Sequence, residues 1–299
     1  MQEKLRIIIT GSNGFLGQHL VNFLSQRHFK VFATSRGANQ NKLTKDLCYY
    51  SLDLTDKVAL NNAIETIKPH IIIHNAAMSK PDSCHNFREE CLLNNVSATK
   101  FLLEASKPLT PYFLYVSTDF IFGEDGPHDE ETMPKPLNFY GESKLKAEQQ
   151  VQESGLSYGI MRPVFIYGPS YEGMRPTFLH WVKNNLEQGK EIKVVNDQRR
   201  TPTYVYDICK GMEAMIDKRF EGAIHLAGKD IFSPYQMALM VAKELNLDSN
   251  LIRPVTSDTF PEPVVRAKQS GLKIDKARRL LNYEPVSFEE GVRQSFISG

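Results

Sequence analysis

The sequence predicts an α/β fold, a doubly wound parallel sheet with a smaller C-terminal part. Short β-branched runs alternate with longer segments of helical period, as in the strand, helix, strand order of residues 5–35. The runs at residues 7–9 and 71–73 are isoleucine at every position. Both faces of such strands are expected to be buried, because helices cover both sides of a parallel sheet.

The expected elements follow in order along the first 168 residues. Each expected strand is short and bounded by turn residues, and each expected helix carries apolar residues at mixed spacings of three and four. Prolines mark two helix ends, Pro69 after residues 56–68 and Pro108 near the end of residues 87–106. The other expected elements are strands at 5–10, 30–35, 70–76, 111–118 and 158–168, a strand ending at Asp53, and a helix at 15–27.

A glycine-rich turn joins the first expected strand to the first expected helix. Gly11, Gly14 and Gly17 stand at three-residue intervals, in "TGSNGFLG". Glycines at this spacing allow a tight turn, close approach of a pyrophosphate to bare backbone, and close packing of the helix on the sheet. We expect a Rossmann-type dinucleotide site, with a turn that serves only packing as the alternative. The expected contacts from this turn also include Asn13, Phe15 and Leu16.

The end of the second expected strand indicates which dinucleotide binds. An NAD-binding protein usually has a carboxylate here for the ribose 2′-hydroxyl, but this chain has Ser35 and Arg36. A hydroxyl and a guanidinium suit a 2′-phosphate, so NADP(H) is favoured over NAD(H), with a surface arginine as the alternative. Asp53, next to Leu54, could accept a hydrogen bond from the adenine amine, or it could cap the following helix.

Composition excludes several classes of partner. Acidic and basic residues nearly cancel, at 35 against 36. We therefore expect neither nucleic acid nor a membrane as a partner. The four cysteines form no CxxC pair and show no spacing with histidines, so we expect no metal site and no disulfide framework. The N-terminal apolar run is too short for a signal peptide, and we expect a cytoplasmic protein.

Tyr140 and Lys144 are four residues apart, at the start of a helix that we expect to be exposed. Positions i and i+4 share a helix face, and an ammonium near a phenol lowers the phenol pKa. The pair therefore suits proton donation at neutral pH. Two solvated surface side chains are the alternative for this spacing taken alone.

Four motifs in fixed order link the chain to a known family. With TGSNGFLG, "HNAA", "STDFIFG" and "YGESK", the sequence resembles the extended short-chain dehydrogenase/reductases, and most closely the dTDP-4-dehydrorhamnose reductase family. The resemblance covers nearly the whole chain, including "DQRRTPTY" and "IHLAG". It implies an oxidoreductase that reduces a 4-keto nucleotide sugar with NADPH, and it favours the catalytic interpretation of the tyrosine and lysine.

The resemblance also implies roles for individual residues. Tyr140 protonates the developing alkoxide, Thr118 holds that oxygen, with Ser117 as the neighbouring alternative, and Lys144 lowers the tyrosine pKa and binds the nicotinamide ribose. Along the cofactor the resemblance implies Asn75, Ala76, Ala77 and Asn95, although Asn95 suits a structural helix position equally well. On the substrate side it implies Ser79, Thr118, Asp119 and Arg200, with a solvated basic loop as the alternative for Arg200.

The same resemblance suggests how the chain is divided. We expect a dinucleotide-binding domain at 1–163, to which about 203–228 return, and a substrate-binding part made of 164–202 and 229–299. After residue 163 the sequence is rich in Pro, Gly and polar residues, so we expect loops and small elements there rather than more sheet. A homodimer is a further expectation, but Cys84, His85 and Ala267 depart from the family pattern, so metal-linked dimer contacts are not assumed.

Two alternatives to a reductase remain open. A nucleotide-sugar epimerase would share the fold and the cofactor. Asp119 is followed by Phe120, so the adjacent Asp-Glu pair common in dehydratases is absent. A non-catalytic NADP-binding subunit is the third hypothesis, because the regulatory beta subunit of methionine adenosyltransferase resembles the same subgroup.

Overall fold

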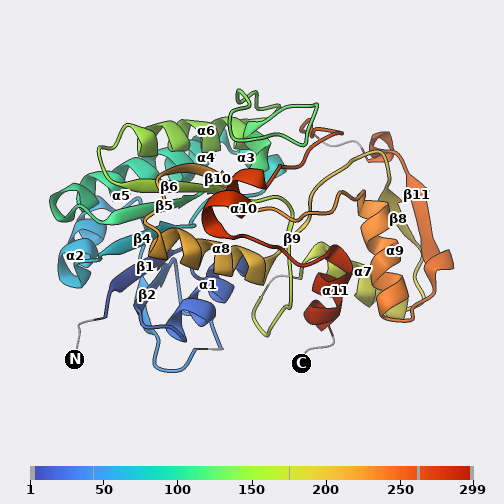
Figure 1. The fold of residues 1–299 in the computed structure, drawn as a ribbon, viewed down its shortest axis with the longest axis horizontal. Coiled ribbons are helices and arrows are strands. Elements are labelled where there is room, and N and C mark those ends of the chain that lie inside the picture. Colours follow the sequence, from blue (N-terminus) through green and yellow to red (C-terminus); the bar gives the residue numbers. More distant parts are fainter. Residues whose placement is uncertain (1–3, 43, 175, 261–262, 297–299) are drawn as a thin grey trace.

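A seven-stranded parallel sheet forms the centre of the molecule (Figure 1). The computed structural model describes residues 4–42, 44–174, 176–260 and 263–296. The strand order is β10-β6-β5-β4-β1-β2-β3. The strands are β1 (Arg6–Thr10), β2 (Lys30–Ser35), β3 (Cys48–Ser51), β4 (Ile71–His74), β5 (Tyr112–Val116), β6 (Tyr158–Arg162) and β10 (Gly222–His225).

Helices cover both faces of this sheet, which confirms the predicted fold class (Figure 1). Ile7 and Ile9 of β1 pack in a core with one helical layer, whereas Ile8 packs in the core on the opposite face. This alternation is the period of two expected of a strand buried on both sides. One layer contains α1 (Phe15–Ser25), α8 (Val205–Asp217) and α10 (Asp275–Leu281), and the other contains α2 (Lys57–Ile67), α5 (Ala98–Ser106) and α6 (Phe139–Gln152).

The helix expected over residues 87–106 is interrupted and begins earlier. Proline at the first position starts α3 (Pro81–Asn86), and Phe87, with φ −125° and ψ 64°, separates it from α4 (Arg88–Leu92). A π-helical turn, η1 (Leu93–Ser97), then leads into α5. Such turns break the period of 3.6, so the apolar pattern could not locate them.

The C-terminal part has more regular structure than expected. Its own apolar core joins two small parallel sheets to three helices. The expectation of loops and small elements was therefore incomplete, because short two-stranded sheets leave little periodic signal. The elements are β7 (Ile166–Tyr167) paired with β9 (Thr203–Tyr204), β8 (Ile192–Val195) paired with β11 (Ile252–Val255), and α7 (Phe178–Glu187), α9 (Pro234–Glu244) and α11 (Phe288–Phe296). The division into two domains stays a prediction.

Short 3₁₀ turns complete the described chain. They are η2 (Lys107–Leu109), η3 (Asp119–Ile121), η4 (Ser249–Leu251) and η5 (Ser257–Thr259). Every helix in the described ranges is too short or too polar to span a lipid bilayer.

Candidate active site

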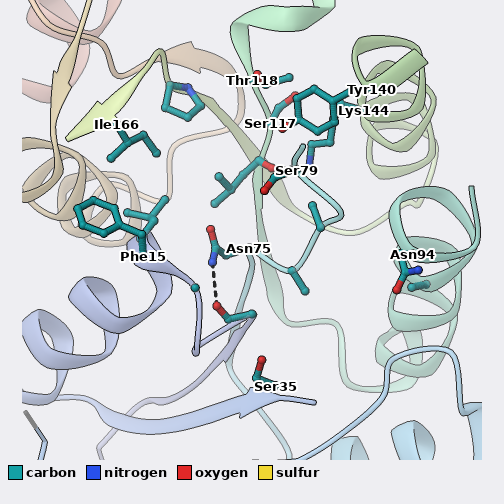
Figure 2. Close-up of a pocket in the computed structure, with 18 of the residues that line it drawn as sticks. Phe15, Ser35, Asn75, Ser79, Asn94, Ser117, Thr118, Tyr140, Lys144 and Ile166 are labelled. Atoms are coloured by element: carbon teal, nitrogen blue, oxygen red, sulfur yellow. Dashed lines mark hydrogen bonds between the residues drawn. The ribbon is translucent and has the colours of Figure 1, made fainter. Parts of the chain in front are cut away.

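A cavity of about 630 Å³ lies where the carboxyl ends of β1, β4 and β5 meet. The strand order reverses between β1 and β4, and parallel α/β sheets bind ligands at such a switch point. Figure 2 shows Ser35 at one end of the cavity and Tyr140 with Lys144 at the other, with Asn75 between them. The cavity is therefore long, with chemically different ends.

The glycine turn forms one wall of the cavity. Gly11 has φ +65°, and a Cβ there would lie 2.7 Å from the Cα of Ala76. The Asn75 side-chain amide donates to the Gly11 carbonyl at 3.2 Å, the hydrogen bond drawn in Figure 2. Gly17 does not line the cavity, but a Cβ there would collide with the Gly11 carbonyl. Its role is close packing of α1 on the turn.

The end nearest β2 and β3 is lined by Ser35, Arg36, Asp53 and Leu54. The Asp53 carboxylate accepts hydrogen bonds from the Thr55 backbone N–H, at 2.9 Å, and from its hydroxyl, at 2.8 Å. These two hydrogen bonds help to lower the pKa of Asp53. Helix α2 is capped by Asp56 instead, so the helix-capping alternative for Asp53 was wrong.

Helix α6 carries the tyrosine and lysine, and it is capped by Asn138, whose side chain accepts from the Gly141 N–H at 3.0 Å. The expectation of an exposed helix was wrong here. Tyr140 is 7% exposed and Lys144 is 2% exposed. Ser143, Lys144 and Glu148 are also buried, and because all three are polar the sequence did not reveal that this face of the helix is covered.

The pKa of Tyr140 is raised, not lowered. Burial of the phenol is the main cause, a hydrogen bond with Thr118 opposes it, and the carboxyl of Asp119 adds to it. The expectation that Lys144 makes the phenol more acidic therefore does not hold for the protein alone. The phenol keeps its proton at neutral pH.

Lys144 is anchored at the end of β5. Its ammonium donates to the Val116 carbonyl at 2.7 Å and lies 4.1 Å from the centre of the Tyr115 ring. Burial lowers the pKa of Lys144 to about 7, and Glu148 is the strongest opposing influence. The ammonium is therefore charged only below about neutral pH, until another anion approaches it.

Thr118 and Asp119 lie at the start of η3. The Thr118 hydroxyl accepts from the Phe120 N–H at 3.2 Å and donates to the Asp119 carboxylate at 3.3 Å. Burial raises the pKa of Asp119 to about 6, while the guanidinium of Arg200 lowers it. Arg200 lines a small second cavity that also contacts Asp119. The Ser117 hydroxyl is buried and has no hydrogen-bond partner among the described residues.

A buried polar cluster lies behind the tyrosine. The Asn95 side chain accepts from the Met78 N–H at 2.7 Å and donates to the Ser143 hydroxyl at 2.9 Å. It thereby links the segment after β4 to α6 without lining the cavity. Cys84 and Cys91 share a hydrogen bond that raises the pKa of Cys84 and lowers that of Cys91. Sequence spacing did not predict this contact.

Most of the predicted site residues line the cavity. Those on its wall are Gly11, Gly14, Phe15, Leu16, Ser35, Arg36, Asp53, Leu54, Asn75, Ala76, Ala77, Ser79, Thr118, Asp119, Tyr140 and Lys144. The others lie outside it: Asn13, which holds the 38–40 loop, Gly17, Asn95 and Arg200. No group of three or more His, Cys, Asp or Glu side chains in the described ranges is arranged to hold a metal ion.

Several lining residues were missed. Besides Phe120, the cavity contacts Phe165 and the segment 176–178, which approach from the C-terminal part. Ser117, the alternative named beside Thr118, also lines it. Phe165 has φ +40°, a conformation unusual for a residue with a side chain. The only sequence signal is its position just after the strand that ends at Arg162.

Comparison with known proteins relates the whole chain to one family. The family described as RmlD substrate binding domain matches residues 5–298. Methionine adenosyltransferase 2 subunit beta from Mus musculus is 27% identical over 300 residues, covering 97% of this chain and 86% of that protein.

Solved structures show the same architecture. The dTDP-4-dehydrorhamnose reductase from Bacillus anthracis, solved in complex with NADP, is 30% identical with a TM-score of 0.88, covering 99% of this chain and 100% of that one. The UDP-glucuronic acid 4-epimerase from Bacillus cereus, solved with UDP-glucuronic acid and NAD, is 24% identical with a TM-score of 0.85, covering 98% of each chain. The epimerase comparison shows a shared fold.

Proposed function

The chain belongs to the RmlD substrate binding domain family, and from this premise we propose that it is an NADPH-dependent reductase of 4-keto nucleotide sugars. The observation that carries the proposal is the meeting of Tyr140, Thr118 and Lys144 at one end of a cavity whose other wall is a glycine turn. A cavity with phosphate-binding and proton-donating ends suits hydride transfer from a dinucleotide.

The residues present fit an NADP cofactor. Gly11, at φ +65°, and Gly14 line the cavity without side chains, so the backbone of the turn is bare where a pyrophosphate would approach. Arg36 lines the far end of the cavity, next to Ser35, where a 2′-phosphate would be held by charge and hydrogen bonds. The NADP in the Bacillus anthracis reductase supports this choice over NAD.

The chemistry at the other end follows from the protonation states. When bound, NADPH supplies the hydride that reduces a ketone carbon. Tyr140 keeps its proton because burial raises its pKa, and a protonated phenol is what the developing alkoxide requires. Thr118 lies within hydrogen-bond reach of the phenol and can hold the same substrate oxygen. Lys144 places a positive charge beside this site when protonated, which stabilises negative charge on the phenol as the proton leaves.

The substrate class rests on the family and on the second cavity. Asp119 lines both cavities, and Arg200 lines the second one beside it. A guanidinium there suits the diphosphate of a nucleotide sugar. Ser79, on the wall of the main cavity, is proposed to contact the sugar.

A regulatory subunit is the second candidate function. The observation in its favour is the 27% identity to methionine adenosyltransferase 2 subunit beta over 97% of the chain. The presence of a threonine, tyrosine and lysine in one buried cavity favours an enzyme. An epimerase remains a third candidate on the shared fold.

The test is an NADPH oxidation assay with the purified full-length protein. We expect absorbance at 340 nm to fall with dTDP-4-keto or UDP-4-keto sugars, and to fall more slowly with NADH. The regulatory function would be supported instead by two results together. The protein would bind NADPH but oxidise it with none of the nucleotide-linked 4-keto sugars, and it would co-elute with a methionine adenosyltransferase catalytic subunit. Conversion of a nucleotide sugar to its 4-epimer without net cofactor consumption would identify an epimerase.

A further inference from the structure

A buried ion pair joins the helix of Tyr140 and Lys144 to the sheet. The Glu148 carboxylate of α6 accepts two hydrogen bonds from the Arg162 guanidinium at the end of β6, at 3.0 Å and 2.7 Å. Their side chains are 1% and 5% exposed. Burial of two charges has a large desolvation cost, so such a pair is weak evidence for a role in stability alone. Its position suggests another role.

Glu148 lies one helical turn beyond Lys144, at i+4, so both side chains lie on the same face of α6. The groups that the Lys144 ammonium touches directly, the Val116 carbonyl and the Tyr115 ring, carry no net charge. Glu148 therefore supplies the formal negative charge on this face of the helix. Its carboxylate opposes the effect of burial on the pKa of Lys144.

The other titratable groups around Lys144 do not replace this carboxylate. His74 of β4 is fully buried, and burial together with the charge of Lys144 lowers its pKa to about 3, so it is neutral. Tyr140 and Cys84 have raised pKa values and are also neutral. Cys91 of α4 shares a hydrogen bond with Cys84 and acts on Lys144 less than Glu148 does.

Arg162 connects the same pair to the wall of the cavity. Its guanidinium lies 5.3 Å from the centre of the Phe122 ring, and its backbone carbonyl accepts from the Leu226 N–H at 3.1 Å. The next residue, Pro163, lines the cavity and accepts from the Asp119 N–H at 3.2 Å. The ion pair thus fixes α6 relative to the strand end that carries the substrate side of the site.

We propose that Glu148, oriented by Arg162, is a positioning residue whose carboxylate keeps the buried Lys144 ammonium charged for cofactor binding and proton transfer. Arg162 holds the carboxylate in one geometry through its two hydrogen bonds. This inference rests on the proposed function, because it assigns Lys144 to the site of an NADPH-dependent reductase.

The test follows the protonation of Lys144 in the protein without nucleotide. Lysines labelled with ¹³C at Cε are titrated by NMR from pH 5 to 11. The Lys144 signal is assigned as the one that is absent from the spectrum of the Lys144→Met variant. We expect its midpoint to fall by about one pH unit or more in Glu148→Gln, since a nearby carboxylate has been lost. An unchanged midpoint in a folded Glu148→Gln protein would overturn the proposal.

Two further variants separate charge from folding. Glu148→Gln leaves Arg162 buried and unpaired, so the double variant Glu148→Gln/Arg162→Gln, which removes both charges, is titrated as well. It should show the same direction of shift, and an unchanged midpoint there counts equally against the proposal. Glu244→Gln is the matched control: this carboxylate is 7% exposed and pairs with Arg293 at 2.6 Å, far along the chain on α9. It should lose stability without moving the Lys144 midpoint, and a similar shift there would also overturn the proposal.

A binding titration distinguishes this inference from the proposed function. NADPH affinity is measured by fluorescence for the unaltered protein and for Glu148→Gln. Failure of the unaltered protein to bind NADPH would reject the proposed function, whereas the NMR midpoint decides the role of Glu148 in either case. If the unaltered protein binds, Glu148→Gln should weaken binding more at pH 8 than at pH 6.

Discussion

The Lys144 ammonium donates a 2.7 Å hydrogen bond to the backbone carbonyl of Val116, two residues before Thr118. The lysine on α6 and the threonine after β5 are therefore held by one contact between helix and strand. Because the ammonium has three donors, this anchor leaves others for a ligand. Tyr140 stands one turn before the lysine, so the same contact also positions the phenol.

Tyr140→Phe should reduce turnover by about 10²-fold or more and leave the NADPH dissociation constant nearly unchanged. General acid catalysis contributes a factor of this size, and the phenol oxygen acts on the substrate rather than on the nucleotide. Steady-state kinetics and fluorescence titration measure the two effects. Near-normal ketone reduction by this variant would contradict the mechanism.

Lys144→Met should lose both turnover and NADPH affinity. In the unaltered protein the pKa of Lys144 is lowered to about 7, so the ammonium is present below that pH and is lost above it. We therefore expect NADPH binding to weaken as the pH rises from 6 to 9, and this dependence to flatten in Lys144→Met. Lys146→Met, on an exposed position of the same helix, is the control and should behave like the unaltered protein. If NADPH binding had the same pH dependence in Lys144→Met and Lys146→Met, the assignment of Lys144 to the cofactor site would be wrong.

Arg36→Asp should weaken NADPH binding by about tenfold or more and NADH binding much less. The substitution replaces a partner for the 2′-phosphate with a charge that repels it. Lys42→Asp makes the same charge change at an exposed residue that does not line the cavity. If the unaltered protein bound NADPH and NADH equally well, the assignment of Ser35 and Arg36 would be wrong.

His74→Asn should reduce the loss of stability in acid. His74 bridges Thr10 and Thr99 at 2.8 Å and 2.9 Å, and burial lowers its pKa to about 3. Below pH 6.5 His74 takes up a proton in the unfolded chain but not in the folded protein. This group therefore lowers the free energy of unfolding by about 1.4 kcal/mol for each pH unit. Urea unfolding at pH 7, 6 and 5 should show a shallower decline in the variant. A parallel decline would mean that another group is responsible.

Gly17→Ala should destabilise the protein by about 2 kcal/mol or more and weaken NADPH binding. A Cβ at this position would collide with the Gly11 carbonyl and lie 2.8 Å from the Cα of Ser12, which forces the turn away from α1. Gly155→Ala is the control, because Gly155 has φ +77° but a Cβ there would have no other atom within 4 Å. That variant should cost about 1 kcal/mol from backbone strain alone and leave binding intact.

Local signals predicted the sheet and the glycine turn. Ile7 to Ile9 and the turn from Gly11 to Gly17 are encoded within about a dozen neighbouring residues, because strand burial and turn geometry depend on adjacent side chains. The same kind of signal could not detect the break at Phe87 or the two-stranded sheets of the C-terminal part, since the break is one residue and these strands are only two or four residues long.

The sequence by itself determined the alternation of strands and helices in the first part of the chain, the position of the dinucleotide turn, and the pairing of Tyr140 with Lys144 on one helix face. Only the tertiary structure decided that this face is buried, that the phenol holds its proton, and that Glu148 meets Arg162 beneath the site. The reason is physical: spacing along a helix depends on bonds within the chain, whereas desolvation and charge pairing depend on segments that only folding brings together.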